Sequence, residues 1–343
     1  MNKKEWESTN DSHLSGRGDN HLFSRNQGAR RKLPVETQKK GNGRAGVGEA
    51  TPDGAGKKDA GRPVIEERWI ELAGGRMRYL KAGSGRALIL VHGLLGYAFS
   101  WRFTMSALVP YATVYAIDNL GAGLSVAAEG MDCCMRATAE RVLKFADAAG
   151  LDEFDLLGTS HGGGVAAMVA AICVERGDQR LRRLILVAPV NPWSPRGKTL
   201  APFLASPIGG MLFRNTIQRW RWFDHLWLRR LFGDGSKIPA DSLAGYRIPV
   251  LENHGFRHAA NILKTWRADL AELEAALPKI RDFPTLLVWG TKDRAVHFPS
   301  AEPLRRNFRD VRLLTFKGVG HLPYEEAPEE FNRALIEFIT APR

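Results

Sequence analysis

Three residues of types that could together carry out acyl transfer are found far apart in the sequence. Ser160 lies in the segment Gly158-Thr159-Ser160-His161-Gly162, and Asp293 and His321 each follow a later apolar run. A serine hydroxyl is a poor nucleophile until a base removes its proton, and histidine, with an unperturbed pKa of about 6.5, suits that role. A carboxylate can orient the histidine and stabilise its protonated form. We therefore predict Ser160 as the nucleophile, His321 as the base and Asp293 as the group that orients His321.

The segment around Ser160 has the pattern of a sharp strand-to-helix turn. It follows the apolar run Phe154–Leu157 and leads into Gly162–Glu175, which is rich in Ala, Val, Met and Ile. Glycine on each side of the serine removes side chains that would clash in such a turn. A Gly-x-Ser-x-Gly match is weak by itself, so the strand before it and the helix after it support the prediction.

The elements that must position these residues follow from the hydrophobic pattern. Short continuous apolar runs are typical of parallel strands that are covered on both faces. They occur at Ala87–Val91, Thr113–Ile117, Phe154–Leu157, Leu184–Val187, Thr285–Trp289 and Val311–Phe316. Before them, Glu67–Leu72 and Met77–Ala82 indicate a hairpin with a Gly74-Gly75 turn.

Helical patterns alternate with these runs, at Arg136–Ala149, Gly162–Glu175 and Glu329–Thr340. The alternation predicts an α/β fold with a doubly wound, mostly parallel sheet and an antiparallel start. Catalytic groups gather at the carboxyl ends of the strands in such a sheet.

The composition divides the chain into three regions. Residues 1–62 are predicted to form a disordered basic tail, because they cannot bury enough apolar surface to offset their ordering entropy. Residues 63–190 and 281–343 form the predicted α/β core. Residues 191–280 contain no buried strand run but five tryptophans and the helical pattern Trp266–Leu277. They predict a helical cap inserted before the strand that carries Asp293.

Taken together, several motifs resemble the α/β-hydrolase superfamily over about residues 65–340. They are His92-Gly93-Leu94-Leu95-Gly96, Asp118-Asn119-Leu120-Gly121-Ala122-Gly123-Leu124-Ser125, the Ser160 turn, Trp289-Gly290-Thr291-Lys292-Asp293 and Gly320-His321-Leu322-Pro323. The most similar branch is the capped one that holds esterases, C–C bond hydrolases and cofactor-free haloperoxidase-like enzymes. The resemblance implies an oxyanion hole made by the backbone N–H groups of Leu94 and His161, with no metal and no organic cofactor.

The resemblance also limits the reaction. Relatives that dehalogenate or open epoxides carry an aspartate at the position of Ser160, so an alkyl-enzyme route is disfavoured here. We expect a serine hydrolase that acts on a carboxylic ester or related acyl substrate through an acyl-enzyme intermediate. Two alternatives stay open: a C–C bond hydrolase or perhydrolase with the same triad, and a ligand-binding or receptor-like protein of this fold with little turnover.

Three further polar residues lie near the predicted site. We expect His92 to hydrogen-bond backbone near the oxyanion hole and the His161 side chain to point away from the nucleophile. Asn191 follows the strand Leu184–Val187, where some relatives keep their acid. An amide cannot stabilise an imidazolium as a carboxylate does, which leaves Asp293.

Charge and cysteine content limit which binding partners and which cellular compartment are expected. The net charge is +12, of which residues 1–62 carry +5. No nucleic-acid-binding module accompanies this excess, so a small-molecule substrate is expected and nucleic acid is not. The chain has neither an apolar run long enough to span a membrane nor a signal-peptide core, and Cys133, Cys134 and Cys173 have neither a disulfide framework nor zinc spacing. These features predict a cytoplasmic protein.

Arginine and tryptophan are interleaved in one part of the predicted cap. We expect an apolar entrance with a basic rim there, which would favour bulky or anionic acyl substrates or weak contact with an anionic lipid surface. The residues are Arg214, Arg219, Trp220, Arg221, Trp222, Trp227, Arg229 and Arg230.

Overall fold

The computed structural model describes residues 64–195, 203–219, 221–251 and 253–342. The predicted tail, residues 1–62, lies outside the described residues. Within them, no helix combines the length and the apolar content that crossing a bilayer requires.

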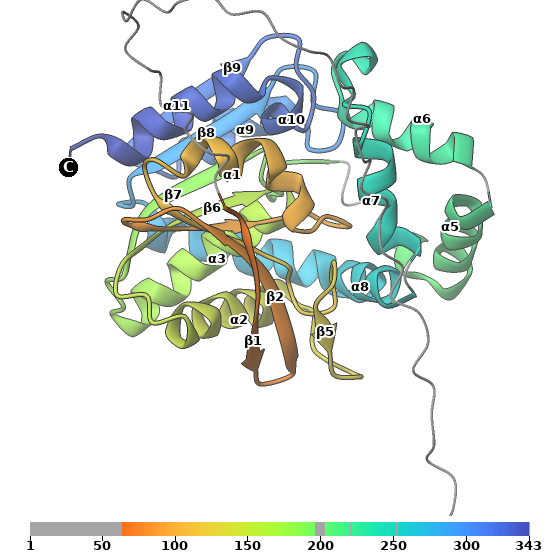
Figure 1. Ribbon diagram of the computed structural model, residues 1–343, viewed down its shortest axis with the longest axis horizontal. Helices are drawn as coiled ribbons and strands as arrows, with labels where there is room; N and C mark the ends of the chain where they lie inside the picture. The colour runs from red at the N-terminus through yellow and green to blue at the C-terminus, as the bar shows by residue number, and fades with distance from the viewer. Residues whose placement is uncertain (1–63, 196–202, 220, 252, 343) are drawn as a thin grey trace, which may run out of the picture. The chain divides into compact units, whose positions relative to one another are not determined.

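A nine-stranded sheet forms the centre of the described chain (Figure 1). Its strands are β1 (Glu66–Leu72), β2 (Gly75–Ala82), β3 (Ala87–Val91), β4 (Thr113–Ile117), β5 (Val126–Ala127), β6 (Phe154–Thr159), β7 (Leu181–Val187), β8 (Thr285–Gly290) and β9 (Val311–Phe316). The spatial order is β1-β2-β4-β3-β6-β7-β8-β9, with β5 beside β2. Strands β1 and β2 are antiparallel to their neighbours, and β3, β4 and β6 to β9 pair in parallel. The predicted mostly parallel sheet with an antiparallel start is confirmed.

The first hairpin differs from the prediction by one residue. Leu72 pairs with Gly75, so the turn consists of Ala73 and Gly74 and not of Gly74 and Gly75. Gly75 is instead the first residue of β2, where the short strand β5, which was not predicted, approaches closely. A Cβ on Gly75 would lie 2.1 Å from the carbonyl oxygen of Val126. Glycine at position 75 is therefore needed for the close approach of β5 to β2, and not for the turn.

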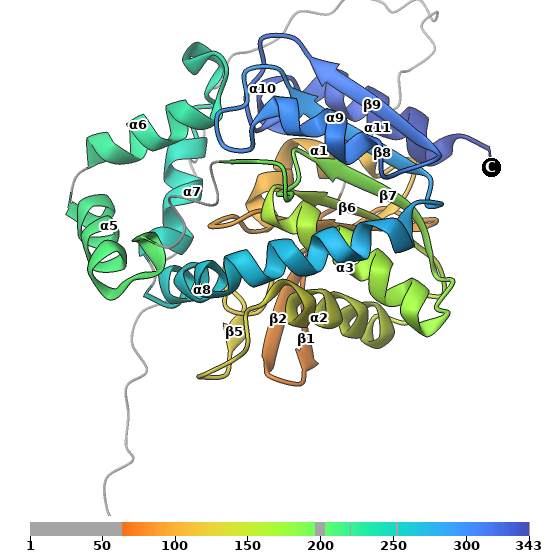
Figure 2. The ribbon, with the colours of Figure 1, turned by 180° about the vertical axis from the view of Figure 1, so that it is seen from behind.

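Helices cover both faces of the sheet (Figures 1 and 2). On one face α2 (Met135–Ala148), α3 (His161–Arg176), the end of α8 (Asn253–Ala276) and α9 (Ala301–Arg305) share one buried cluster. On the other face α1 (Arg102–Leu108), α10 (Pro323–Glu326) and α11 (Pro328–Thr340) share a second cluster. Two buried layers, one on each face, explain why the parallel strands are continuously apolar.

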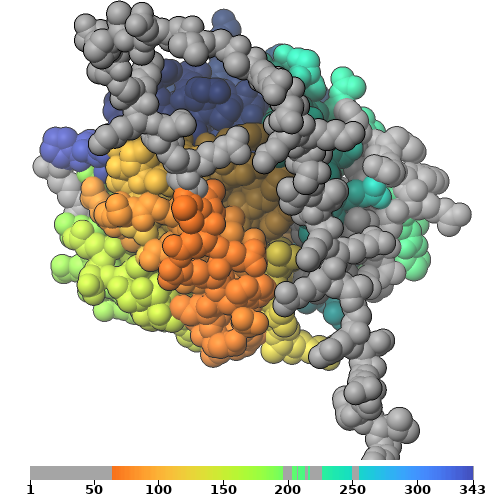
Figure 3. Space-filling view, in the orientation of Figure 1, coloured from red at the N-terminus to blue at the C-terminus, as the bar shows by residue number. Residues whose placement is uncertain are grey.

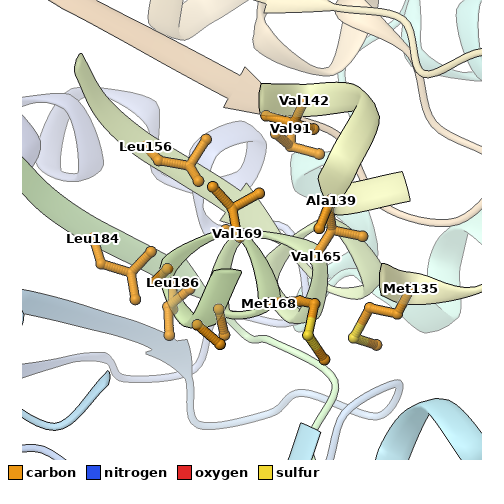
Figure 4. Packing of buried hydrophobic residues seen from close by; sticks show 14 of the residues in the cluster. Val91, Met135, Ala139, Val142, Leu156, Val165, Met168, Val169, Leu184 and Leu186 are labelled. Carbon is orange, nitrogen blue, oxygen red and sulfur yellow. The ribbon is translucent and has the colours of Figure 1, made fainter. Parts of the chain in front are cut away.

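The helix α3 is the most deeply enclosed of these elements. Residues 161–173 are all buried, as expected of a helix that is apolar on every side. Figure 4 shows side chains of α3 packed among those of the strands and of α2. The labelled residues are Val165, Met168 and Val169 of α3, Val91, Leu156, Leu184 and Leu186 of the strands, and Met135, Ala139 and Val142 of α2. This packing fixes the start of α3, where Ser160 lies.

A helical segment lies between β7 and β8. It contains α5 (Pro207–Arg219), α6 (Arg221–Leu231), α7 (Ser242–Leu251) and α8. Figures 1 and 2 show α5, α6 and α7 grouped together at one end of α8. From Ile262 onward α8 packs into the buried cluster of α2 and α3, so α8 joins the inserted segment to the core. The boundaries of the cap at residues 191 and 280 stay a prediction.

The first hairpin lies at the surface of the molecule. Figure 3 shows it in orange on the near side, and β1 has no fully buried residue. A buried carboxylate, Asp118, links β2, the second strand of the hairpin, to the segment after β4. Asp118, directly after β4, has no exposed side-chain surface and forms a salt bridge with the Arg78 guanidinium of β2 at 3.1 Å. Its two oxygens also accept the backbone N–H groups of Ala98 and Leu124 at 2.7 and 3.0 Å.

Replacing Asp118 tests this anchor. We expect Asp118→Ala to lower the free energy of unfolding by about 3–5 kcal/mol, because the Ala98 and Leu124 N–H groups lose their acceptor and Arg78 keeps only its half-exposed partner Glu67. Urea unfolding followed by circular dichroism measures the change. Glu337→Ala is the matched control, because it breaks the exposed pair with Arg312. Equal stability of the two variants would contradict the anchoring role.

Candidate active site

Ser160 occupies a strained turn between β6 and α3. Its backbone has φ 54° and ψ −121°, a conformation that L-residues rarely adopt and that costs on the order of 1–3 kcal/mol. Two hydrogen bonds tie it to the neighbouring segment 187–190: the Ser160 N–H donates to the Val187 carbonyl at 2.9 Å, and the Ser160 carbonyl accepts the Val190 N–H at 3.0 Å. The last residue of β7 and the loop after it thus hold the serine backbone.

Close backbone packing explains the glycines of this turn. A Cβ on Gly158 would lie 2.1 Å from the Gly162 carbonyl oxygen, and one on Gly162 would lie 2.3 Å from that of His92. Neither site has room for a side chain. Within the stretch Phe154–Cys173, Ser160 is the single residue that is not buried. The turn therefore presents one hydroxyl at the end of an otherwise enclosed strand and helix.

Asp293 and His321 lie at the carboxyl ends of the neighbouring strands β8 and β9 and form a direct contact. The Asp293 Oδ2 is 2.8 Å from the His321 Nδ1, and both side chains are buried. The other oxygen, Oδ1, accepts the backbone N–H groups of Ala295 and Val296 at 2.7 and 2.9 Å. A carboxylate only accepts hydrogen bonds, so the proton of His321 is assigned to Nδ1. Nε2 is then left as the basic nitrogen.

Glu326 holds the loop that carries His321, and the sequence reasoning missed it. Its Oε2 accepts the N–H groups of Gly320 and Gly233, and its Oε1 accepts that of Asp234, all at 2.8 Å. The His321 N–H itself donates to the carbonyl of Leu231, the last residue of α6, at 2.6 Å. The base loop is therefore attached to the inserted helical segment. The acidic pair Glu325-Glu326, which ends the short helix α10, was the available signal in the sequence, but the backbone N–H groups that Glu326 accepts are known only from the fold.

The two predicted oxyanion donors belong to segments that lie next to Ser160. The N–H of His161, the first residue of α3, has no acceptor within the helix, as is usual for a first turn. Leu94 follows β3 and lines the same cavity as Ser160. Gly93 lies against the nucleophile, since a Cβ there would be 3.1 Å from the Ser160 Cβ. These positions suit an oxyanion hole, which stays a prediction.

Both nitrogens of the His92 ring contact backbone, as predicted. Nδ1 lies 2.8 Å from the Gly93 carbonyl oxygen, and Nε2 accepts the N–H of Asn119 at 3.1 Å. Burial lowers the pKa of His92, which therefore stays neutral near pH 7. Asn191 is likewise engaged, since it donates to Pro189 and Ser300. These hydrogen bonds of Asn191 hold the loop after β7 in place.

The His161 side chain has a structural role that the sequence did not indicate. Its ring stacks on Trp266 of α8, with the centroids 6.0 Å apart and the planes at 23°. Its Nε2 is buried and has no hydrogen-bond partner in the described chain. Burial, with a smaller contribution from His92, lowers the pKa of His161 to about 4. The imidazole beside the nucleophile is therefore neutral near pH 7.

A cavity of about 110 Å³ adjoins the nucleophile. Its lining is mainly apolar, with a few polar groups among the side chains. The lining residues are Leu94, Ser160, Val190, Asn191, Ser194, Trp266, Leu270, Ala295 and Val296. Ala295 and Val296 also hold Asp293, so the cavity touches both the nucleophile and the acid loop. This arrangement can admit a small, largely apolar group next to the Ser160 hydroxyl.

Acid should destabilise the protein through His161. The unfolded chain binds a proton on this residue below about pH 6.5, but the folded protein binds it only near pH 4. The contribution of His161 to the free energy of unfolding is therefore fully present above pH 6.5. It is lost as the pH falls toward 4, which lowers the free energy of unfolding by up to about 3 kcal/mol. His161→Phe keeps a ring against Trp266 without the titration and should lose less stability over that window. Urea titrations at pH 4.5 and 7.5 compare the two proteins, and equal losses would contradict the assignment.

Glu326→Gln tests the attachment of the base loop. An amide nitrogen cannot accept a hydrogen bond, so at least one buried N–H loses its partner, at a cost of about 1–3 kcal/mol. We expect reduced stability in urea and a shifted or broadened NMR signal of the His321 Nδ1 proton. Glu330→Gln, exposed on α11, is the control and should leave both unchanged. An unaltered Nδ1 signal in Glu326→Gln would contradict the role.

Comparisons with known proteins agree with this architecture. Residues 88–334 match the sequence profile of the alpha/beta hydrolase family. Haloalkane dehalogenase 2 of Mycobacterium tuberculosis (strain ATCC 25618 / H37Rv) is 31% identical over 281 residues, which cover 80% of this chain and 94% of that protein. A 2-hydroxymuconate semialdehyde hydrolase of Pseudomonas sp. (strain CF600) is 26% identical over 284 residues, covering 79% and 93%.

A solved structure gives the same result. The crystal structure of a membrane phospholipase A, a bacterial virulence factor, superposes with a TM-score of 0.68 at 25% identity, covering 80% of this chain and 86% of that one. The sheet order, the strand-to-helix turn and the sequence match all lead to one assignment. The chain belongs to the alpha/beta hydrolase family.

Proposed function

We propose that this protein is a serine hydrolase that cleaves a carboxylic ester or related acyl substrate through an acyl-enzyme intermediate. The observation that carries the proposal is the buried contact between Asp293 Oδ2 and His321 Nδ1 at 2.8 Å. It lies at the sheet edge where the strained turn presents the Ser160 hydroxyl. A nucleophile and an acid–base pair at one sheet edge are the groups that activation of a serine needs, which supports the proposal.

The proposed reaction has two halves. Ser160 Oγ attacks the substrate carbonyl while His321 Nε2 takes its proton, and the N–H groups of Leu94 and His161 stabilise the developing oxyanion. His321 then protonates the leaving alcohol, and the acyl group stays on Ser160. Water, deprotonated by His321, attacks this ester, and His321 then returns the proton to Ser160 Oγ as the acid is released. Asp293 accepts the hydrogen bond of His321 Nδ1 and stabilises the imidazolium in both halves.

The similarity to a dehalogenase does not transfer its reaction to this chain. A serine that displaced a halide from an alkyl carbon would form an ether. An ether has no carbonyl for water to attack, so the enzyme could not be regenerated. Acyl transfer avoids this problem, because a serine ester is open to attack by water. The chemistry of Ser160 therefore supports acyl substrates.

C–C bond hydrolysis is the second candidate. The similarity to the 2-hydroxymuconate semialdehyde hydrolase favours it, and that match covers most of both chains. The same three residues serve both reactions, because only the leaving group differs. Steady-state assays with phenyl esters and with a vinylogous 1,5-diketone acid distinguish the candidates.

The inserted segment is proposed as a cap over the site. Trp220 lies outside the described residues, and the side chains of Arg214, Arg219, Arg221 and Trp222 are not described, so the basic rim and its lipid contact stay predictions. Two described features support them. Ile208, Met211 and Leu212 are exposed along α5, and Arg229 and Arg230 are exposed on α6.

The cytoplasmic location also stays a proposal, which the three free cysteines support.

A fluorophosphonate probe tests the nucleophile. We expect labelling of the wild-type protein and none of Ser160→Ala, because the probe forms a covalent bond only with an activated serine. Turnover of p-nitrophenyl esters should fall by at least about 1000-fold in the variant. Labelling without turnover of any ester or C–C substrate would favour the receptor-like alternative. Labelling of Ser160→Ala would contradict the assignment of the nucleophile.

A further inference from the structure

Two of the groups that act on an acyl substrate line the cavity beside Ser160, and the base does not. The nucleophile lines it together with Leu94, whose N–H is a proposed oxyanion donor, but His321 is not among the described residues around it. The base must reach the leaving group in order to protonate it. The leaving group therefore lies outside this cavity, and the part of the substrate inside it is the acyl group.

The lining of the cavity carries no charge among the described residues. Its polar side chains already have partners within the chain. The Asn191 amide donates to the Pro189 carbonyl and the Ser300 hydroxyl, and the Ser194 hydroxyl accepts the N–H of His297 at 3.4 Å. A carboxylate placed there would lose its hydration without gaining a cation, which is unfavourable. The cavity therefore favours an uncharged acyl group.

The volume of the cavity limits the length of this group. In another protein an engineered cavity of about 150 Å³ takes up benzene, which has six carbons. By that scale the cavity of about 110 Å³ holds a chain of about four carbons. A longer chain requires the wall to move, and close-packed protein interiors resist such movement.

Leu270 of α8 forms part of the cavity wall, four residues after Trp266. The Trp266 ring stacks on His161, the first residue of α3. Lys279, in the short helix that follows α8, forms a salt bridge at 2.8 Å with Glu175, near the end of α3. The helix α8 therefore runs along α3 in the same direction. Leu270 lies about 6 Å further along it than Trp266, away from the turn that holds the nucleophile.

The position of Leu270 is fixed by its surroundings. The residue is 6% exposed and belongs to the buried cluster on this face of the sheet, together with Leu273. Asp269, the residue before it, holds α8 against the first residue of α2, because its Oδ1 accepts the N–H of Met135 at 3.1 Å. A wall that is held by packing and by a buried hydrogen bond sets a definite limit to the cavity.

We propose that Leu270 is a specificity-determining residue that limits the acyl part of the substrate to an uncharged chain of about four carbons. The inference rests on the proposed serine hydrolase function and specifies its substrate. It differs from the bulky or anionic acyl group that the arginine-rich segment of the cap predicts, because the cavity at the nucleophile lacks the volume and the charge for such a group.

A series of p-nitrophenyl esters tests the length limit, because it keeps one leaving group and varies the acyl chain from acetate through butanoate and hexanoate to octanoate. We expect kcat/KM of the wild type to be highest for butanoate and at least about 10-fold lower for octanoate. Leu270→Ala enlarges the cavity and should raise the ratio of octanoate to butanoate by at least about 10-fold. Leu270→Phe fills it and should move the optimum to acetate. A wild type that prefers octanoate, or an unchanged ratio in Leu270→Ala, would overturn the inference.

Two further comparisons test the acyl assignment and the charge. In the series ethyl, butyl and octyl butanoate only the alcohol varies, and neither variant should change the profile of the wild type. A change here in place of the acyl series would put the leaving group in the cavity and overturn the inference. Between methyl pentanoate and monomethyl glutarate, the wild type should prefer the uncharged ester by at least about 10-fold. Preference for the anionic ester would also overturn it.

Leu273→Ala is the matched control, because Leu273 is buried in the same helix and cluster but is not among the described residues that line the cavity. It should leave the acyl-length profile unchanged, and a shift equal to that of Leu270→Ala would contradict the role of Leu270. Melting temperatures show whether the variants are folded, and Leu270→Val provides a milder truncation if Leu270→Ala is not. If the wild type hydrolyses none of the esters and takes no fluorophosphonate label, the proposed function itself fails.

Discussion

The conformation of Ser160 is the constraint on which the rest of the site depends. A residue with φ 54° and ψ −121° cannot continue either a strand or a helix, so the chain turns sharply there and leaves the side chain at the surface of the turn. The strain persists because its surroundings determine it. The end of β7 and the loop that follows it bond the two backbone groups of the serine, and α3 is packed on all sides. The backbone hydrogen bonds and the packing of α3 in the core therefore offset the strain that holds the Ser160 hydroxyl in place.

Buried carboxylates fix the other parts of the same sheet edge. Asp118, Asp293 and Glu326 each follow or adjoin the carboxyl end of a parallel strand and accept two or three hydrogen bonds, mainly from backbone N–H groups. Irregular loops leave such donors unpaired, and a buried unpaired donor is costly. An ionised carboxylate can satisfy several donors at once. One oxygen of Asp293 accepts the loop N–H groups, and the other contacts His321. The same carboxylate therefore holds its loop and orients the imidazole.

The inserted helices are connected to the site at two points. The end of α6 bonds the base loop through Leu231 and Glu326, and α8 contacts the start of α3 through Trp266 and His161. A change in the position of these helices would therefore reach both the base and the residue after the nucleophile. Both contacts lie within bonding or stacking distance, so the inserted helices and the candidate site are physically connected.

The strand pattern, the mostly parallel sheet and the candidate residues Ser160, Asp293 and His321 were predictable from the sequence. Continuous apolar runs require strands that are covered on both faces, and parallel strands place the loops after them at one edge. The sequence did not reveal the short strand β5, the residue at which the hairpin turns, the role of Glu326 or the lining of the cavity beside Ser160. Each of these depends on which groups of distant segments meet. Only the tertiary structure decides whether a buried polar atom finds a partner, because hydrogen bonding and cavity shape arise from contacts between segments that local pattern does not encode.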